Sequence, residues 1–440
     1  MAIIVPFRGV RYNQAQAGKL AELVTPPYDV IYEAEQRHFY EKNDYNIIRL
    51  EYGEIHSGDD SQNNRYTRAH SFFKTWLEQH ILVHDEQPAI YLYEQEFTAS
   101  GSRLTRSGFI AGIKVEDYET GIILPHEETL SKAKADRLEL LRHCHANFSP
   151  IFGLYDDSSL TVEKIASRYK QNKANVAFTD ESGESHRLWI INNSGDLATI
   201  SSLFKNQKVY IADGHHRYET ALNFYKEMLD KGDSRFSFCL MTLVNLHDPG
   251  LVIYPTHRLV KNVAGFNAEE FLDNLKQIFT VTTLALPAAD RGAILSAELN
   301  AVAALRADSH AFLLYLGGEK LHRLILRRAT DNQLMAACCS TFSPAWRSLD
   351  VAILQSLVLE GMLGIDKEAR AGGTNLAYTR DEAGALDRVD TGEFQAVFYL
   401  NPTQVREVTE VAAAGDKMPQ KSTFFYPKLI TGLVINDFTV

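Results

Sequence analysis

A short apolar run that passes through a glycine turn into a helical pattern is the feature that most constrains this chain. Residues 208–212 (Lys-Val-Tyr-Ile-Ala) predict a short buried strand. Residues 216–230 carry apolar side chains on one helical stripe and predict a helix. The turn between them reads Asp213-Gly214-His215-His216-Arg217. The fold must therefore start a helix directly at the end of a buried strand.

This turn has the chemistry of an anion-binding site. The first N–H groups of a helix lack intrahelical partners and carry a partial positive charge. Gly214 allows the backbone to turn sharply and approach a ligand, and the histidines and arginine that follow add donors suited to phosphate oxygens. We therefore predict that residues 213–217 bind phosphate and form the centre of the active site. The structural alternative makes Asp213 an ordinary N-cap and leaves the histidines on the surface.

A second segment with reactive side chains reads Pro125-His126-Glu127-Glu128-Thr129. A helix that starts here places Glu127 in its first turn. A carboxylate beside a phosphate pocket can act as a general base and take a proton from an attacking hydroxyl group. The alternative is that Glu127 only stabilises the helix start, where acidic residues are common.

A third segment reads Met418-Pro419-Gln420-Lys421-Ser422-Thr423. Its proline stops regular structure, and three donor side chains follow in a row. Such a loop suits a carboxylate or phosphate ligand. The alternative is a solvated loop that leads into an aromatic strand at 424–426.

Composition and motifs exclude several classes of protein. The formal net charge of −11 argues against a dedicated DNA or RNA binder, which needs a surplus of Lys and Arg. The four cysteines form no CxxC pair, and no zinc-binding spacing is present. GxxxxGK[ST], GxGxxG after a strand, and GxSxG are all missing from the sequence. The longest internal apolar run, Phe238 to Val244, is too short to span a bilayer. We expect a cytoplasmic protein with no nucleic-acid or membrane partner; the sequence does not predict its oligomeric state.

The remaining periodicity predicts a mixture of helices and strands. Asn267 is expected to cap a helix, and Gly317-Gly318 is expected to join a hairpin. We predict strands at 3–7, 46–52, 89–96, 104–115, 150–155, 187–192, 238–246, 251–260 and 394–400, and helices at 64–80, 126–144 and 348–363.

The three reactive segments belong to a longer series of motifs. They are Pro6-Phe7-Arg8-Gly9, Pro26-Pro27-Tyr28-Asp29-Val30, His126-Glu127-Glu128-Thr129, Asp136-Arg137-Leu138, Ala212-Asp213-Gly214-His215-His216-Arg217, Thr256-His257-Arg258-Leu259, Leu400-Asn401-Pro402-Thr403, Met418 to Lys428, and Gly432-Leu433-Val434. In this order they resemble a large bacterial and archaeal family of unknown function, domain-of-unknown-function family ten-fifteen. The resemblance covers nearly the whole chain.

That family is similar to the ParB/sulfiredoxin-like superfamily, which implies a fold of the α+β class. We expect a ParB/sulfiredoxin-like core of mixed sheet and helices, with additional N- and C-terminal α/β lobes. The division we expect is a strand-rich lobe at 1–120, a core at 121–262 that carries the first two reactive segments, and a lobe at 263–440 that returns the third to the site. Sulfiredoxin-like chemistry is disfavoured because no cysteine lies in 213–217.

The segments also resemble those of the archaeal ADP-dependent free serine kinase. The resemblance implies that Glu127, with His126, is the catalytic base, and that residues Asp213, Gly214, His215, His216 and Arg217 hold the nucleotide phosphates. It implies that Lys421, Ser422 and Thr423 hold the substrate. Asp213 is expected to take part in catalysis and to hold Mg²⁺, directly or through water.

The resulting prediction is a phosphotransferase that moves phosphate from ADP or ATP to a small hydroxyl substrate such as free serine. This chain departs from the kinase in its greater length, in the insertion of Gln420 and in the aromatic residues at 424 and 425. These departures concern the substrate more than the phosphate chemistry. The alternatives are a non-catalytic nucleotide-binding regulator and a nucleotide hydrolase.

Overall fold

The computed structural model describes residues 1–129 and 131–439, without the side chains of 131–133, 328–332 and 371. In this part of the chain it divides into two compact units. Unit 1 contains Met1–Pro125, Thr129–Val252 and Phe425–Val440, and unit 2 contains His126–Glu128 and Ile253–Phe424. Two short strands, β13 (Val252–Tyr254) and β20 (Phe424–Tyr426), contain points where the chain passes from one unit to the other.

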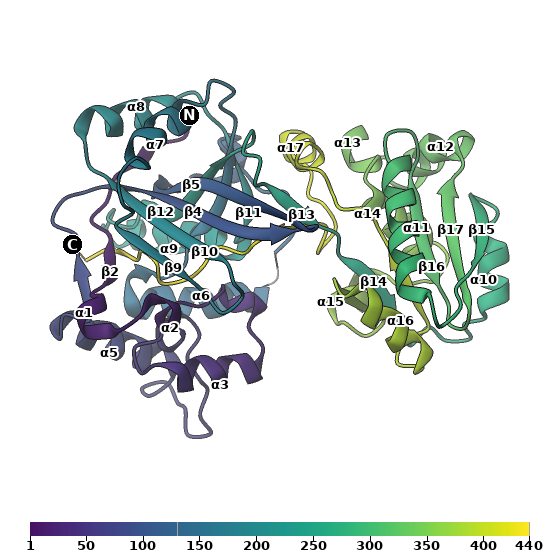
Figure 1. Ribbon diagram of the computed structural model, residues 1–440, viewed down its shortest axis with the longest axis horizontal. Coiled ribbons are helices and arrows are strands. Elements are labelled where there is room, and N and C mark those ends of the chain that lie inside the picture. The colour runs from purple at the N-terminus through teal and green to yellow at the C-terminus, as the bar shows by residue number, and fades with distance from the viewer. Residues whose placement is uncertain (130, 440) are drawn as a thin grey trace. The chain divides into compact units, whose positions relative to one another are not determined.

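Unit 1 is built on a mixed sheet that has nine strands in the described residues (Figure 1). Their order is β6-β11-β8-β12-β5-β4-β10-β9, and β1 pairs with β5. The β12–β8 and β11–β6 pairs are parallel and the others antiparallel. The strands are β1 (Ile4–Val5), β4 (Ile90–Ala99), β5 (Ser102–Lys114), β6 (Ile123–Leu124), β8 (Ile151–Tyr155), β9 (Val176–Thr179), β10 (Ser185–Ile191), β11 (Val209–Asp213) and β12 (Phe238–Asn245).

Helices cover this sheet and bury one continuous apolar core. Ile165 of α7, Phe204 of α8 and Tyr218 of α9 share that core with Phe109 of β5. The helices of unit 1 are α1 (Gln14–Ala17), α2 (Leu20–Leu23), α3 (Glu33–Lys42), α4 (Ile48–Glu51), α5 (Arg65–Glu78), α6 (Ser131–Cys144), α7 (Thr161–Tyr169), α8 (Ser194–Phe204) and α9 (His215–Asp230), with 3₁₀ turns η1 (Tyr28–Val30) and η2 (Tyr118–Thr120). Two small ribbons pair β2 (Val10–Tyr12) with β3 (Leu82–His84) and β7 (Ala146–Asn147) with β21 (Asn436–Asp437).

Unit 2 has its own antiparallel sheet, with six strands among the described residues, in the order β15-β17-β16-β19-β14-β18 (Figure 1). α11 and α16 pack on it through Leu295 and Leu386, which share a core with Leu313. The strands are β14 (His257–Val260), β15 (Phe279–Ala285), β16 (Ala311–Tyr315), β17 (Lys320–Leu326), β18 (Leu376–Thr379) and β19 (Ala396–Tyr399). The helices are α10 (Ala268–Leu275), α11 (Arg291–Leu305), α12 (Arg328–Cys338), α13 (Pro344–Arg347), α14 (Asp350–Ile353), α15 (Lys367–Ala371), α16 (Glu382–Asp390) and α17 (Val405–Ala413), with a π-helical segment η3 (Leu354–Glu360).

The α+β class predicted from the sequence is confirmed, but the division into lobes is different. The boundary expected near residue 120 separates β4 and β5 from β8 and β12. These strands lie in one sheet, with β5 hydrogen-bonded to β12, and therefore belong to one unit. The boundary expected near 262 falls close to the observed crossing within β13, but the last residues, from Phe425, return to unit 1.

Three predicted elements also differ from the structure. The strand expected at 46–52 is the short helix α4, because the Asn46 side chain accepts a hydrogen bond from the N–H of Ile48 and turns the chain directly before the helix. The strand expected at 251–260 is interrupted at Pro255, which cannot donate to a ladder. The helix expected at 348–363 widens into η3 after Ile353.

Other expectations are confirmed. Asn267 caps α10 by accepting hydrogen bonds from the N–H groups of Glu269 and Glu270. The hairpin around Gly317-Gly318 joins β16 to β17. In the part of the chain that the structure describes, every helix is too short or too polar to cross a membrane.

Candidate functional site

The predicted phosphate turn is a strand–glycine–helix junction within unit 1. Asp213 is the last residue of β11, and His215 is the first of α9. Between them Gly214 has φ +91°, a left-handed conformation that side-chain-bearing residues rarely adopt. Gly214, not Asp213, is the N-cap, and no side chain in the described residues caps this helix. The positive end of a 16-residue helix is therefore not neutralised by a capping carboxylate.

Asp213 forms ion pairs with two basic side chains instead of capping the helix. Its Oδ2 accepts a hydrogen bond from Arg217 Nη2 at 2.8 Å, and its Oδ1 pairs with Lys428 Nζ. Arg217 Nη1 also donates to the carbonyl of Pro150 at 2.6 Å. We call Asp213, Arg217 and Lys428 the Asp213 cluster. It contains one carboxylate and two cationic groups, and so has a surplus of one positive charge.

Electrostatics keep this carboxylate ionised. Burial alone would raise the pKa of Asp213, but the opposite charges of Lys428 and Arg217 outweigh it and lower that pKa well below its usual range. His215, which is buried, lowers it further. His216 follows on the first turn of α9 and is half-buried. The side chains of Asp213, Arg217 and Lys428 retain 17%, 10% and 13% of their exposure, so the cluster is largely shielded from solvent.

Lys428 is a member of this cluster that the sequence did not indicate as a site residue. Its position depends on the backbone around it. Gln95 Nε2 donates to the carbonyl of Lys428 at 2.9 Å, and Arg106 Nη2 donates to the carbonyl of Pro427 at 2.6 Å. Arg106 is itself buried, and burial lowers its pKa to about 10. Two side chains from β4 and β5 thus fix the segment that carries the lysine.

A buried ionic network lies next to Arg217. Arg137 pairs with Glu51 at 3.3 Å and lies 4.0 Å from the ring centre of Tyr28. Glu51 also accepts a hydrogen bond from Ser149. A cavity of about 40 Å³ is lined by Glu51, Arg137 and Arg217 among others. It has room for a few water molecules at most.

The other two predicted segments meet within unit 2. The N–H of Met418 donates to the carbonyl of His126 at 2.7 Å, and the N–H of Lys421 donates to Glu127 Oε1 at 2.9 Å. His126 is fully buried, and its Nε2 lies 2.9 Å from Thr423 Oγ1. We call His126, Glu127 and residues 418–423 the Glu127 cluster. Glu127 is not in the first turn of a helix, as we expected, because it forms a bridge with Met418 and α6 begins only at Ser131.

The hydroxyl groups expected to hold a substrate are already used within this cluster. Ser422 is buried, and its Oγ donates to the carbonyl of Pro419. The hydroxyl of Thr423 is engaged with His126. Both hydroxyl groups hold the shape of the loop, whereas the Lys421 side chain is exposed. The backbone of Lys421 has a φ of +58°. Of the three residues expected to hold the substrate, Lys421 is the one whose side chain is exposed, and the substrate role stays a prediction.

Arg258 is a further cation beside the Glu127 cluster. Its Nη2 lies 3.4 Å from the carbonyl of Gln420, and its charge interacts with Glu127. Burial lowers its pKa to about 10. It lies in the Thr256-His257-Arg258-Leu259 motif, which belongs to the family resemblance and to which the sequence assigned no role in the site.

The surroundings of Asp213 do not fit a direct magnesium ligand. Each of its carboxylate oxygens already contacts a cation, Arg217 at one and Lys428 at the other. A divalent cation placed there would repel both groups at short range. The expectation that Asp213 holds Mg²⁺ directly is therefore not supported by this arrangement, and a contact through water stays a prediction.

Comparison with known proteins places the chain in one family. The family model described as "Protein of unknown function (DUF1015)" matches residues 4–352. None of the curated protein sequences matches the chain.

Several solved structures are similar at low identity. A conserved hypothetical protein from Pyrococcus furiosus is 13% identical, with a TM-score of 0.33, over 73% of this chain and 92% of that one. A free serine kinase in complex with AMP is 14% identical, with a TM-score of 0.33, over 72% and 86%. SbnI with a C-terminal truncation, from Staphylococcus aureus, is 10% identical, with a TM-score of 0.34, over 73% and 85%. Values this low do not transfer an activity to this chain.

Proposed function

Because the chain belongs to the DUF1015 family, whose description gives no activity, we propose a function from its own residues. We propose that it is a phosphotransferase that moves the terminal phosphoryl group of a nucleotide, ADP or ATP, to the hydroxyl group of a small molecule such as free serine. The observation that carries the proposal is the Asp213 cluster at the start of α9, with its surplus positive charge and its left-handed glycine.

The Asp213 cluster is assigned to the nucleotide phosphates. A helix N-terminus without a side-chain cap attracts anions. Arg217 and Lys428 add a guanidinium and an ammonium group, and both can donate to phosphate oxygens. Asp213 holds the two cations in place and keeps them apart from bulk solvent. In this role the carboxylate organises the donors and does not itself contact the anionic phosphate.

The Glu127 cluster is assigned to the acceptor. The Glu127 carboxylate would take the proton of the acceptor hydroxyl while its oxygen attacks the terminal phosphorus. The bond from that phosphorus to the bridging oxygen breaks, and AMP leaves from ADP, or ADP from ATP. The exposed ammonium group of Lys421 suits the carboxylate of an amino-acid acceptor. His126 supports Glu127 through the backbone, because its carbonyl accepts from Met418 next to the loop that binds Glu127.

No step is assigned to magnesium at Asp213, because both carboxylate oxygens already contact cations. The names of similar structures mention AMP and ADP, which agrees with a nucleotide as the ligand. Nucleotides are abundant in the cytoplasm, the compartment that we propose for the reaction.

A transfer assay tests the proposal. The full chain is incubated with ADP or ATP, with and without Mg²⁺, and with a panel of serine, threonine, homoserine and glycerol, and ³¹P NMR follows the products. The proposal predicts a phosphomonoester that appears only with an acceptor, in step with loss of the nucleotide. Nucleotide loss without an acceptor would identify a hydrolase. Tight nucleotide binding with no product would identify a nucleotide-binding protein without activity. Either result would overturn the proposal that the chain is a phosphotransferase.

A further inference from the structure

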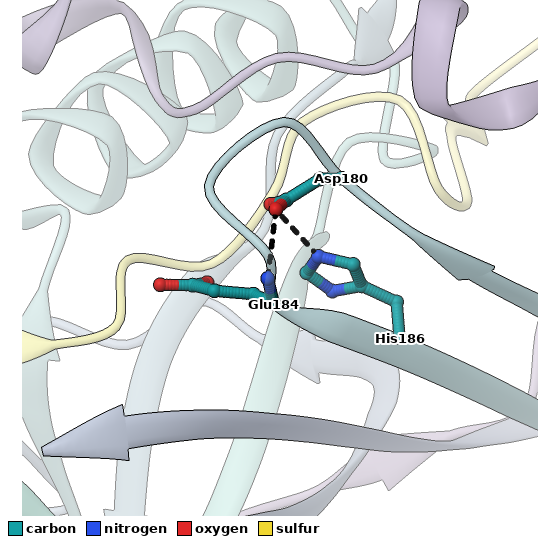
Figure 2. A group of neighbouring side chains, drawn as sticks. All are labelled: Asp180, Glu184 and His186. Carbon is teal, nitrogen blue, oxygen red and sulfur yellow. Dashed lines mark hydrogen bonds and ion pairs between the residues drawn. The ribbon is translucent and has the colours of Figure 1, made fainter. Parts of the chain in front are cut away.

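An aspartate, a glutamate and a histidine gather at the β9–β10 hairpin of unit 1, on residues that the proposed reaction does not use (Figure 2). Asp180 directly follows β9, Glu184 directly precedes β10, and His186 lies within β10. Glu184 and His186 are two residues apart, and such side chains project to the same face of an extended strand. The turn brings Asp180 back to them, with its N–H donating to the carbonyl of Glu184 at 2.9 Å.

The spacing of their polar atoms fits ligands of one metal ion. One ligand atom from each of the three side chains lies within 4.8 Å of the others. His186 Nε2 and Asp180 Oδ2 are 3.1 Å apart. Two atoms that each lie about 2.0–2.2 Å from one ion are separated by roughly this distance. Figure 2 shows the imidazole ring turned toward the Asp180 carboxylate.

The imidazole is held rigidly from its other side. His186 is fully buried, and its Nδ1 lies 2.8 Å from the hydroxyl group of Tyr93. The ring also stacks on Phe178, with ring centres 4.8 Å apart. Metal-binding histidines generally have such a partner on the second nitrogen, which fixes the orientation of the ring.

The cluster contains two carboxylates, and His186 is the nearest basic group, 3.1 Å from Asp180. Among the described residues, no lysine or arginine lies within ion-pair distance of Asp180 or Glu184. Arg106 acts on Glu184 only at longer range, and its Nη2 is engaged by Gln95 and Pro427.

We propose that Asp180, Glu184 and His186 bind one divalent first-row transition metal ion, Zn²⁺ or Mn²⁺. The set of one imidazole and two carboxylates suits these ions, whereas Ca²⁺ and Mg²⁺ prefer ligand sets made of oxygen alone. Three protein ligands leave further coordination positions for water. The ion would tie the turn between β9 and β10 to the buried ring of His186, and so stabilise the folded chain.

Metal binding by the full-length, tag-free chain tests this proposal. After removal of metals with a chelator, ZnCl₂ and MnCl₂ are titrated by calorimetry and the midpoint of thermal unfolding is measured with each ion. We expect one equivalent of one of these ions to bind and to raise the midpoint. Asp180→Asn and Glu184→Gln should each weaken binding at least tenfold. Both variants keep the size of the side chain, and the amide oxygen introduced by Asp180→Asn can still accept the turn hydrogen bond from the N–H of Glu184.

Glu181→Gln is the matched control. Glu181 lies in the same turn but is half exposed and pairs with Lys42 and His38. This variant should bind the ion as the unchanged chain does. Lack of stoichiometric binding of either ion would overturn the proposal, as would binding that is unaffected by Asp180→Asn and Glu184→Gln. In either case the cluster would be a hydrogen-bonded network in which His186 donates to Asp180.

Discussion

Lys428 Nζ contacts Asp213 Oδ1, although the two residues are separated by 215 positions in the sequence. Asp213 therefore lies between two basic side chains, with Lys428 at one carboxylate oxygen and Arg217 at the other. It also gives the start of α9 a surplus positive charge, which a carboxylate at the N-cap would have cancelled. The account of phosphate binding depends on this relationship.

Replacing Lys428 should weaken nucleotide binding. Lys428→Met removes the surplus charge and leaves Asp213 with Arg217 alone. A charge-assisted hydrogen bond contributes about 1.5–3 kcal/mol, so the affinity for ADP should fall by roughly 10- to 100-fold in calorimetric titration. Lys231→Met, at an exposed lysine after the end of α9, is the control and should bind ADP normally. If Lys428→Met and the unchanged chain bind ADP with equal affinity, Lys428 does not take part in nucleotide binding.

Gly214 should be intolerant of any side chain, for two separable reasons. Its φ of +91° strains other residues, and an added Cβ would lie 2.9 Å from Arg217 Nε. Gly232 also has a positive φ, +84°, but an added Cβ there meets nothing within 4 Å. Gly232→Ala should therefore show only the conformational cost, about 1–2 kcal/mol. Gly214→Ala should lose more stability in urea unfolding and should also lose nucleotide affinity.

That comparison isolates the contact with Arg217. If Gly214→Ala and Gly232→Ala lose the same stability and both bind nucleotide normally, the close approach of the glycine to the guanidinium has no functional role.

Breaking the buried pair of Arg137 and Glu51 should be strongly destabilising. Arg137→Ala leaves the fully enclosed Glu51 carboxylate without its cation, which typically costs about 3–5 kcal/mol. Arg142→Ala, on the same helix α6, breaks pairs with Glu139 and Glu227 that are partly exposed, and should cost at most about 1 kcal/mol. Chemical unfolding of both variants measures the difference. Similar losses in the two would show that the Arg137 network is not tightly coupled to folding.

Asp213 should make stability depend on acid pH. Its pKa is lowered in the folded protein, because Lys428 and Arg217 overcome the effect of burial. As pH falls below about 3.9, the ordinary pKa of an aspartate, the carboxyl group of Asp213 is protonated in the unfolded chain but stays ionised in the folded one. The stabilisation by Asp213 is therefore lost as pH falls from this value toward the lower pKa of the folded protein. The difference in unfolding free energy between the unchanged chain and Asp213→Asn should be constant from about pH 5 to 8 and shrink below about pH 4. A difference that stays constant down to pH 3 would contradict the lowered pKa.

Local sequence patterns predicted the strand β11, the helix α9 and the turn between them, because apolar periodicity and a glycine are encoded within a few residues. The contact of residues 126–127 with 418–423 was expected only from the family resemblance. Lys428 and Arg106 had no local signal, since Arg106 acts through the carbonyl of Pro427. The helix at Ile48–Glu51 was missed because the Asn46 side chain accepts a hydrogen bond from the N–H of Ile48, and this local turn overrides an apolar run that looks like a strand.

The most direct test of the account is phosphoryl transfer by Glu127→Gln measured beside Glu128→Gln. Glu127 accepts from the N–H of Lys421, whereas the adjacent Glu128 is exposed and pairs with Lys367. With the acceptor that supports transfer, ³¹P NMR should show a rate about 10²- to 10⁴-fold lower for Glu127→Gln, as expected when a general base is removed. Glu128→Gln should retain the rate of the unchanged chain. Full activity in Glu127→Gln would contradict the central claim.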